Sequence, residues 1–103
     1  MWAQLITARL KPGHEGDIDT LHAQLRAAEQ ANSGLVRSTT MQHQGDPSLL
    51  SIMVVFDSED AARAREKDER RQAALVGARE TMAAMFEGPP DFTDFIVVDE
   101  FVP

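Results

Sequence analysis

The fold is decided by residues 49–56, which read Leu49-Leu50-Ser51-Ile52-Met53-Val54-Val55-Phe56. The run is rich in β-branched and aromatic side chains, and its length is typical of one strand. Because successive side chains of a strand point to opposite faces of a sheet, both faces of this strand are apolar. Such a strand needs a sheet that is covered on both sides.

The neighbouring segments predict three more strands. Residues 35–44 form a second strand-like run, and the turn formers Gly45-Asp46-Pro47-Ser48 between the two runs indicate an antiparallel hairpin. Residues 2–10 alternate loosely and stop at Lys11-Pro12-Gly13, which is typical of a strand that ends in a turn. Residues 95–102 are apolar and predict a fourth strand.

Two helical blocks connect these strands. Between residues 15 and 31 the apolar side chains recur at helical spacing, at Ile18, Leu21, Leu25 and Ala28. A second block follows an N-cap at Asp57 or Ser58 and continues to about Phe86. One straight helix of that length would exceed the size of the domain, so we expect a break within residues 65–72, where the apolar stripe vanishes.

The order βαββαβ predicts a single α+β domain over residues 1–103, with its helices on one face of a four-stranded antiparallel sheet. The chain has helices for only one face, although both faces of residues 49–56 are apolar. A second copy of the sheet is the simplest cover for the other face. We therefore expect a homodimer.

Composition and charge exclude several classes of protein. A net charge of −7 disfavours binding to nucleic acid and to anionic membranes. The absence of cysteine excludes disulfides and thiolate metal sites. His14, Glu15 and Asp17 are potential metal ligands, but no second cluster completes a site, so we expect no metal. Without a leader peptide or a long apolar stretch, a soluble cytoplasmic protein is expected.

The order of elements, the strand exit Lys11-Pro12-Gly13 and the helix entry Phe56-Asp57-Ser58-Glu59-Asp60-Ala61 resemble the antibiotic biosynthesis monooxygenase family of dimeric α+β barrels. The likeness covers nearly the whole chain and rests on short structural motifs. It implies a ferredoxin-like βαββαβ fold and a ligand cavity between the sheet and helices of each subunit. It also implies oxidation of aromatic or quinol-like compounds without a cofactor.

The chain departs from the catalytic residues of this family. Haem-degrading members use an asparagine on the first strand, and a tryptophan and a histidine in the second helical block. Here the asparagine is Asn32 in a turn, the tryptophan is Trp2, and no histidine follows His43. Quinone-forming members use tyrosine among other residues, and this chain has no tyrosine. No catalytic residue can therefore be transferred by motif.

The candidate site comes from the expected hairpin register. A loop of residues 45–48 pairs residue 43 with 50 and 39 with 54, which places Arg37, Thr39 and His43 on the helix side. His22 lies at the edge of the first helix's apolar stripe, and Trp2 and Gln4 of the first strand are further neighbours. An apolar cavity with a few polar groups is the usual form of a small-ligand site.

Each candidate also has a structural explanation. His22 and His43 can be solvated, Arg37 and Thr39 can form sheet or ion-pair contacts, and Trp2 can be a packing residue. A one-residue shift of the hairpin register would move Arg37, Thr39 and His43 to the dimer face. The charged run from Arg63 to Gln72 is typical of a solvated helix face.

The leading hypothesis is a homodimer that binds a small aromatic or polyketide-like compound in this cavity. If the protein is an enzyme, His22 or His43 is the base that prepares the substrate for direct reaction with oxygen, because imidazole titrates near neutral pH. The alternatives are a non-catalytic ligand sensor or carrier and a structural dimerisation domain.

Overall fold

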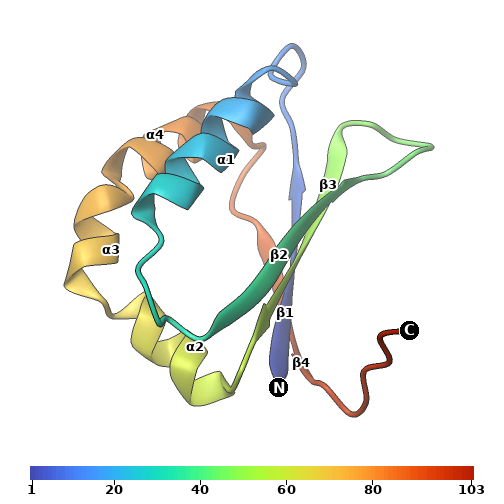
Figure 1. Cartoon of the computed structure of the whole chain (residues 1–103). Helices are drawn as coiled ribbons and strands as arrows, with labels where there is room; N and C mark the ends of the chain where they lie inside the picture. The colour runs from blue at the N-terminus through green and yellow to red at the C-terminus, as the bar shows by residue number, and fades with distance from the viewer.

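The computed structural model describes residues 1–103 and contains one sheet and one layer of helices. The strands are antiparallel, in the order β2-β3-β1-β4, and the helices lie on one side of the sheet (Figure 1). The elements are β1 (Trp2–Arg9), α1 (Asp17–Ala28), β2 (Leu35–Gln42), β3 (Leu49–Phe56), α2 (Glu59–Glu66), α3 (Glu69–Ala74), α4 (Val76–Met85) and β4 (Asp91–Ile96). The predicted α+β class and ferredoxin-like arrangement are confirmed.

The central strands are the ones whose sequence is most apolar. β1 and β3 pair along their whole length, from Trp2 opposite Phe56 to Arg9 opposite Leu49. Even-numbered residues of both strands face the helices, which is why Leu50 and Ala8 are buried side by side. Odd-numbered residues face the opposite side, which we call the outer face.

The second helical block is broken into three pieces. α2 begins after Ser58, whose hydroxyl accepts a hydrogen bond from the Ala61 N–H. It ends at Lys67, and the carboxylate of Asp68 then caps α3 by accepting from the backbone N–H of Arg70. This first break lies within the predicted residues 65–72, because a new N-cap gives the chain a place to turn. A second break, at Leu75 between α3 and α4, has no side-chain cap and was not predicted.

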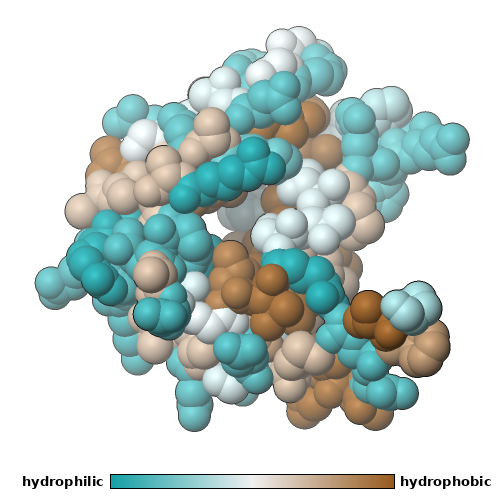
Figure 2. Space-filling model, in the orientation of Figure 1, coloured by the Kyte–Doolittle hydropathy of each residue, from teal (hydrophilic) through white to brown (hydrophobic).

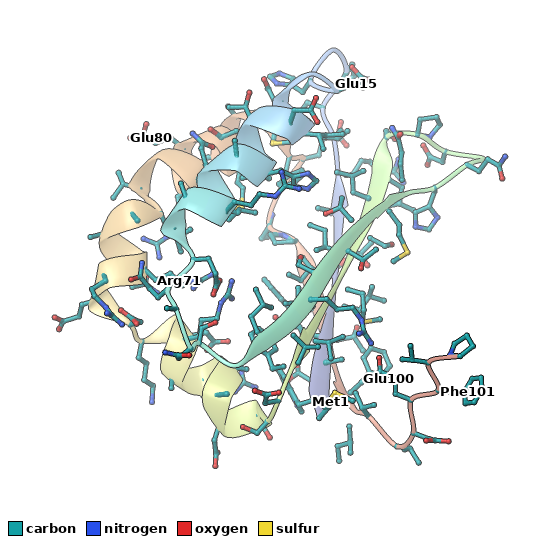
Figure 3. All side chains as sticks on the ribbon, viewed as in Figure 1. Met1, Glu15, Arg71, Glu80, Glu100 and Phe101 are labelled. Atoms are coloured by element: carbon teal, nitrogen blue, oxygen red, sulfur yellow. The ribbon has the colours of Figure 1, made fainter.

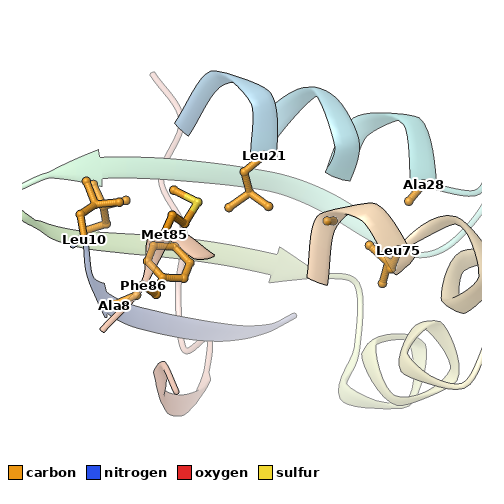
Figure 4. Packing of buried hydrophobic residues seen from close by; sticks show 9 residues of the cluster. Ala8, Leu10, Leu21, Ala28, Leu75, Met85 and Phe86 are labelled. Carbon is orange, nitrogen blue, oxygen red and sulfur yellow. The ribbon is translucent and has the colours of Figure 1, made fainter. Parts of the chain in front are cut away.

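The core is divided into two clusters, one at each end of the helix layer. The larger cluster joins α1, α4 and Leu75, which lies between α3 and α4, to the sheet; Leu10 and Leu50 from the sheet side and Met85 from α4 are among its most buried members (Figure 4). The smaller cluster packs Ala62 of α2 on Val54, Phe56 and Trp2. Between them the helices pack mainly on one another, since α1 contacts α3 and α4.

Two sequence predictions about the sheet are wrong in detail. The hairpin loop is one residue longer than predicted, because the His43 N–H donates to the Leu49 carbonyl and Gln42 lies opposite Leu50. The fourth strand covers Asp91–Ile96 instead of residues 95–102. Its polar residues alternate with Phe92 and Phe95, so the strand is less apolar than the segment that follows it.

Residues 97–103 extend from the end of β4 on the side of the sheet opposite the helices (Figures 1 and 3). Val98, Phe101 and Val102 of this segment are exposed, and Glu100 forms an ion pair with Arg37 of β2. The segment thus adds exposed apolar side chains next to the outer face. No helix of the structure is long and apolar enough to span a membrane.

Candidate functional site

A hollow lies between the helix layer and the middle of the sheet (Figure 2). The strand registers place Thr40, Ile52, Ile6 and Phe92 in one row across this part of the sheet. The adjacent row consists of Ser38, Val54, Gln4 and Asp94. The helix-side surface is therefore apolar in its centre, with small polar groups from β2 and β1, as expected of a small-ligand site.

His22 is the ionisable residue of α1 that faces the sheet. Its Nε2 lies 2.8 Å from the Thr40 hydroxyl, and both side chains are partly buried. No hydrogen bond occupies Nδ1 of the ring, so a hydrogen bond from Nε2–H to Thr40 leaves Nδ1 as a basic nitrogen. The pair can therefore accept a proton while Thr40 holds the orientation of the ring.

Trp2 and Gln4 both lie on the helix side, yet they have different surroundings. The Trp2 ring is buried between Phe56, at 6.0 Å between ring centroids, and the Arg63 guanidinium, at 5.0 Å from the ring centroid. Packing on two sides gives Trp2 a structural role. Gln4 lies in the row next to Ile6, and its amide donates to Asp94 at 2.9 Å.

The predicted placement of Arg37, Thr39 and His43 on the helix side is wrong. Arg37 lies opposite Val55 and Thr39 opposite Met53, and both β3 partners belong to the outer face. His43 is exposed near the hairpin and hydrogen-bonds Ser51 of that face at 2.9 Å. The longer loop causes the error, because a one-residue shift reverses the direction of every side chain.

The structure therefore separates the two histidine candidates and brings a different residue to His22. Thr40 takes the position predicted for Thr39. Because two threonines stand next to each other, the sequence is compatible with either register of the β2–β3 hairpin. Only the length of the hairpin loop distinguishes the two registers. Gln24 of α1 was also missed, and its buried side-chain oxygen has no hydrogen-bond partner.

The charged run from Arg63 to Gln72 is only partly a solvated face. Arg65 is largely buried, stacks 5.4 Å from the Phe56 centroid and donates to both carboxylate oxygens of Glu29. Burial alone would raise the pKa of Glu29, but hydrogen bonds from Arg65 and Ser33 lower it overall. This ion pair connects the end of α1 to α2.

No group of three or more histidine or acidic side chains is arranged to hold a metal ion. His14 and Asp17, two of the three potential ligands considered from the sequence, instead pair with each other at 2.7 Å. Their contact connects the turn before α1 to its first residues, and the acidic Asp17 lies where a helix dipole favours negative charge.

Comparison with known proteins finds similarity in structure. No protein-family model and no curated protein matches the chain. A proposed antibiotic biosynthesis monooxygenase from Nitrosomonas europaea has a TM-score of 0.75 and 15% identity, over 96% of this chain and 100% of that chain. A similar assignment from Chloroflexus aurantiacus has a TM-score of 0.69 and 21% identity, over 99% and 98% of the two chains.

A mutant of MhuD, solved with two manganese protoporphyrin IX molecules per active site, has a TM-score of 0.79 and 14% identity, with both chains fully covered. The similarity extends over nearly the whole of both chains in each case. The chain therefore has the fold of the antibiotic biosynthesis monooxygenase family.

Proposed function

We propose that the protein is a homodimer that binds a small aromatic or polyketide-like compound between α1 and the sheet and oxidises it without a cofactor. The observation that carries this proposal is the His22–Thr40 pair, at 2.8 Å beside an apolar part of the sheet. The fold shared with proposed antibiotic biosynthesis monooxygenases supports the reaction class. The porphyrin ligands of MhuD support a flat aromatic ligand.

In the proposed reaction, His22 takes a proton from an acidic carbon of the substrate. The resulting carbanion adds molecular oxygen and gives a hydroperoxide, which loses water to leave a carbonyl group. One oxygen atom enters the product and the other leaves as water, so the substrate CH2 group is the reductant. Thr40 stabilises the charged imidazole by accepting from its Nε2–H.

The second subunit is proposed to cover the outer face. Phe95 and Met41 of that face are exposed, and Leu5 and Met53, which are partly buried, continue the apolar surface between them. The exposed side chains of residues 97–103 lie on the same side and enlarge it. A surface of this kind on a single chain favours self-association.

Oxygen uptake with anthrone- and naphthol-type substrates tests the reaction. The unsubstituted protein is expected to exceed the buffer rate, and His22→Ala to lose about 10²–10⁴-fold, as for removal of a general base. His43→Ala is the matched control and is expected to retain full activity, because His43 lies on the outer face.

Absence of a rate above buffer would overturn the oxidation, and an equal loss in both histidine variants would overturn the role of His22. A thermal shift with the same compounds but no turnover would instead support a ligand sensor or carrier. The absence of any thermal shift would favour a structural dimerisation domain.

A further inference from the structure

A second cleft lies at the other end of α1, between residues 30–34 and the α2–α3 block. Its volume is about 480 Å³, within the range of small-ligand sites. One part of its wall has small residues, and another has arginines; the residues that line it include Ala31, Gly34, Ala61, Arg65, Asp68 and Arg71. None of the residues in the His22 hollow lines this cleft.

Gly34 allows the connecting segment to pass close to α2. Its φ is +83°, and a Cβ atom at this position would lie 2.6 Å from the Ala61 Cβ. A larger residue would therefore meet both backbone strain and a direct clash. This close contact fixes one wall of the cleft.

Arg71 is the unusual side chain of the cleft. Its guanidinium is half-buried on the inner side of the helix layer (Figure 3), yet it donates no hydrogen bond and forms no ion pair. Glu29, the nearby acid, already accepts from Arg65 at 2.8–3.0 Å and from Ser33 at 2.8 Å. The oxygens of Glu29 are thus occupied, and the donors of Arg71 remain available.

The electrostatic surroundings agree with this arrangement. Burial lowers the pKa of Arg71, and so does the neighbouring positive charge of Arg65. Arg79 acts in the same direction, whereas Glu29 and Glu66 oppose it. A half-buried guanidinium with unused donors costs free energy unless an anion binds it.

The acidic residues that line the cleft leave the Arg71 guanidinium without a partner. Asp68 is bonded to Arg70 and to the start of α3. Asp57 precedes α2 whereas Arg71 follows it. The eight residues of α2 correspond to a length of about 12 Å, so the Asp57 carboxylate lies at the opposite end of the cleft.

We propose that this cleft is an anion site, in which Arg71, assisted by the charge of Arg65, binds the oxygens of a carboxylate or phosphate group on a small ligand. A planar guanidinium with free donors matches both groups in a bidentate geometry. The site is independent of the proposed oxidation, because it shares no residue with the His22 hollow.

Calorimetric titration with benzoate and with phenyl phosphate tests the site and distinguishes the two kinds of anion. Saturable binding of either is expected, and Arg71→Gln is expected to weaken it about tenfold or more through loss of a charge-assisted pair. Arg26→Gln is the control, since Arg26 is exposed and does not line the cleft. Arg71→Lys keeps the charge and is expected to bind with intermediate affinity.

A thermal melt without added anion supplies a second readout. Arg71→Gln is expected to raise the Tm, because the variant removes a half-buried charge that has no hydrogen-bonded partner. A lower Tm would show that Arg71 stabilises the helix layer and would overturn the proposal. The absence of saturable binding of both anions, or an equal loss in Arg26→Gln, would also overturn it.

Discussion

The two faces of the sheet are built from the same strands but meet different surroundings. The helix side is packed at both ends by buried clusters and has the His22–Thr40 pair between them. The outer face has Arg37, Thr39 and Met41 on β2, and the other strands contribute both apolar residues, such as Leu5, Met53 and Phe95, and polar ones, such as Thr7, Ser51 and Thr93. The comparison indicates that the helix side provides most of the packing within the chain; the proposed ligand site lies on that side, and the proposed interface with a second subunit lies on the outer face.

The largest expected difference concerns stability. Leu50→Ala removes a side chain that is 2% exposed in the larger cluster, and a loss of about 2–5 kcal/mol is expected for such a cavity. Val76→Ala on α4 is the control and is expected to cost less than about 1 kcal/mol, because Val76 is 55% exposed and lies outside the outer face. Urea unfolding measures both, and equal losses would contradict the assignment of Leu50 to the core.

Self-association is expected to depend on the outer face alone. Phe95→Lys places a charge there, and the dimer dissociation constant is expected to rise about thirtyfold, or about 2 kcal/mol. Phe92→Lys is the matched control on the helix side of the same strand and is expected to leave the dimer intact. Analytical ultracentrifugation distinguishes them. A monomeric parent protein would refute the assignment of the interface.

The Glu29–Arg65 ion pair is expected to stabilise the helix layer in a pH-dependent way. Because the pKa of Glu29 is lowered from 4.5 in the folded chain, its stabilisation is complete above that value and is lost as the pH falls through the folded pKa. Glu29→Gln is expected to cost about 1–2 kcal/mol at neutral pH and less in acid. Urea unfolding from neutral to acidic pH measures this, and an unchanged pH profile would contradict it.

The smallest expected effect concerns the two threonines. Thr40→Val removes the hydroxyl bonded to His22, with a cost of about 0.5–1.5 kcal/mol, and is expected to change the NMR chemical shifts of the His22 ring. Thr39→Val changes the outer face and is expected to leave those chemical shifts unchanged. If Thr39→Val and not Thr40→Val affected the His22 ring, the hairpin register predicted from the sequence would be the correct one.

The order of elements could be predicted because it depends on local patterns. The apolar spacing of α1, the caps that divide the second block and the two apolar phases of β3 are all visible within short segments. The face assignment of β2 could not be derived in the same way, since it depends on whether four or five residues form the hairpin loop. Turn-forming residues indicate a loop without fixing its length.

Interactions between segments that are distant in the chain could not be predicted from the sequence either. Arg63 and Arg65 belong to a run that is typical of a solvated face, yet they stack on Trp2 and Phe56 from other elements. Residues 97–102 are more apolar than β4, but their exposure indicates that pairing partners, as well as hydrophobicity, decide where a strand ends. Of the candidate residues, the sequence therefore placed His22, Trp2 and Gln4 on the side of the sheet where they lie.

The division of the core into two clusters has a consequence for motion. Because α1 is held by Leu21 and Ala28 of the larger cluster whereas β2 contributes no buried residue to either cluster, the middle of β2 can move away from α1 while both clusters remain intact. Such a local opening breaks the His22–Thr40 bond but exposes little of the packed core, so it costs far less free energy than global unfolding. This gives a ligand a way to enter the hollow without unfolding the chain.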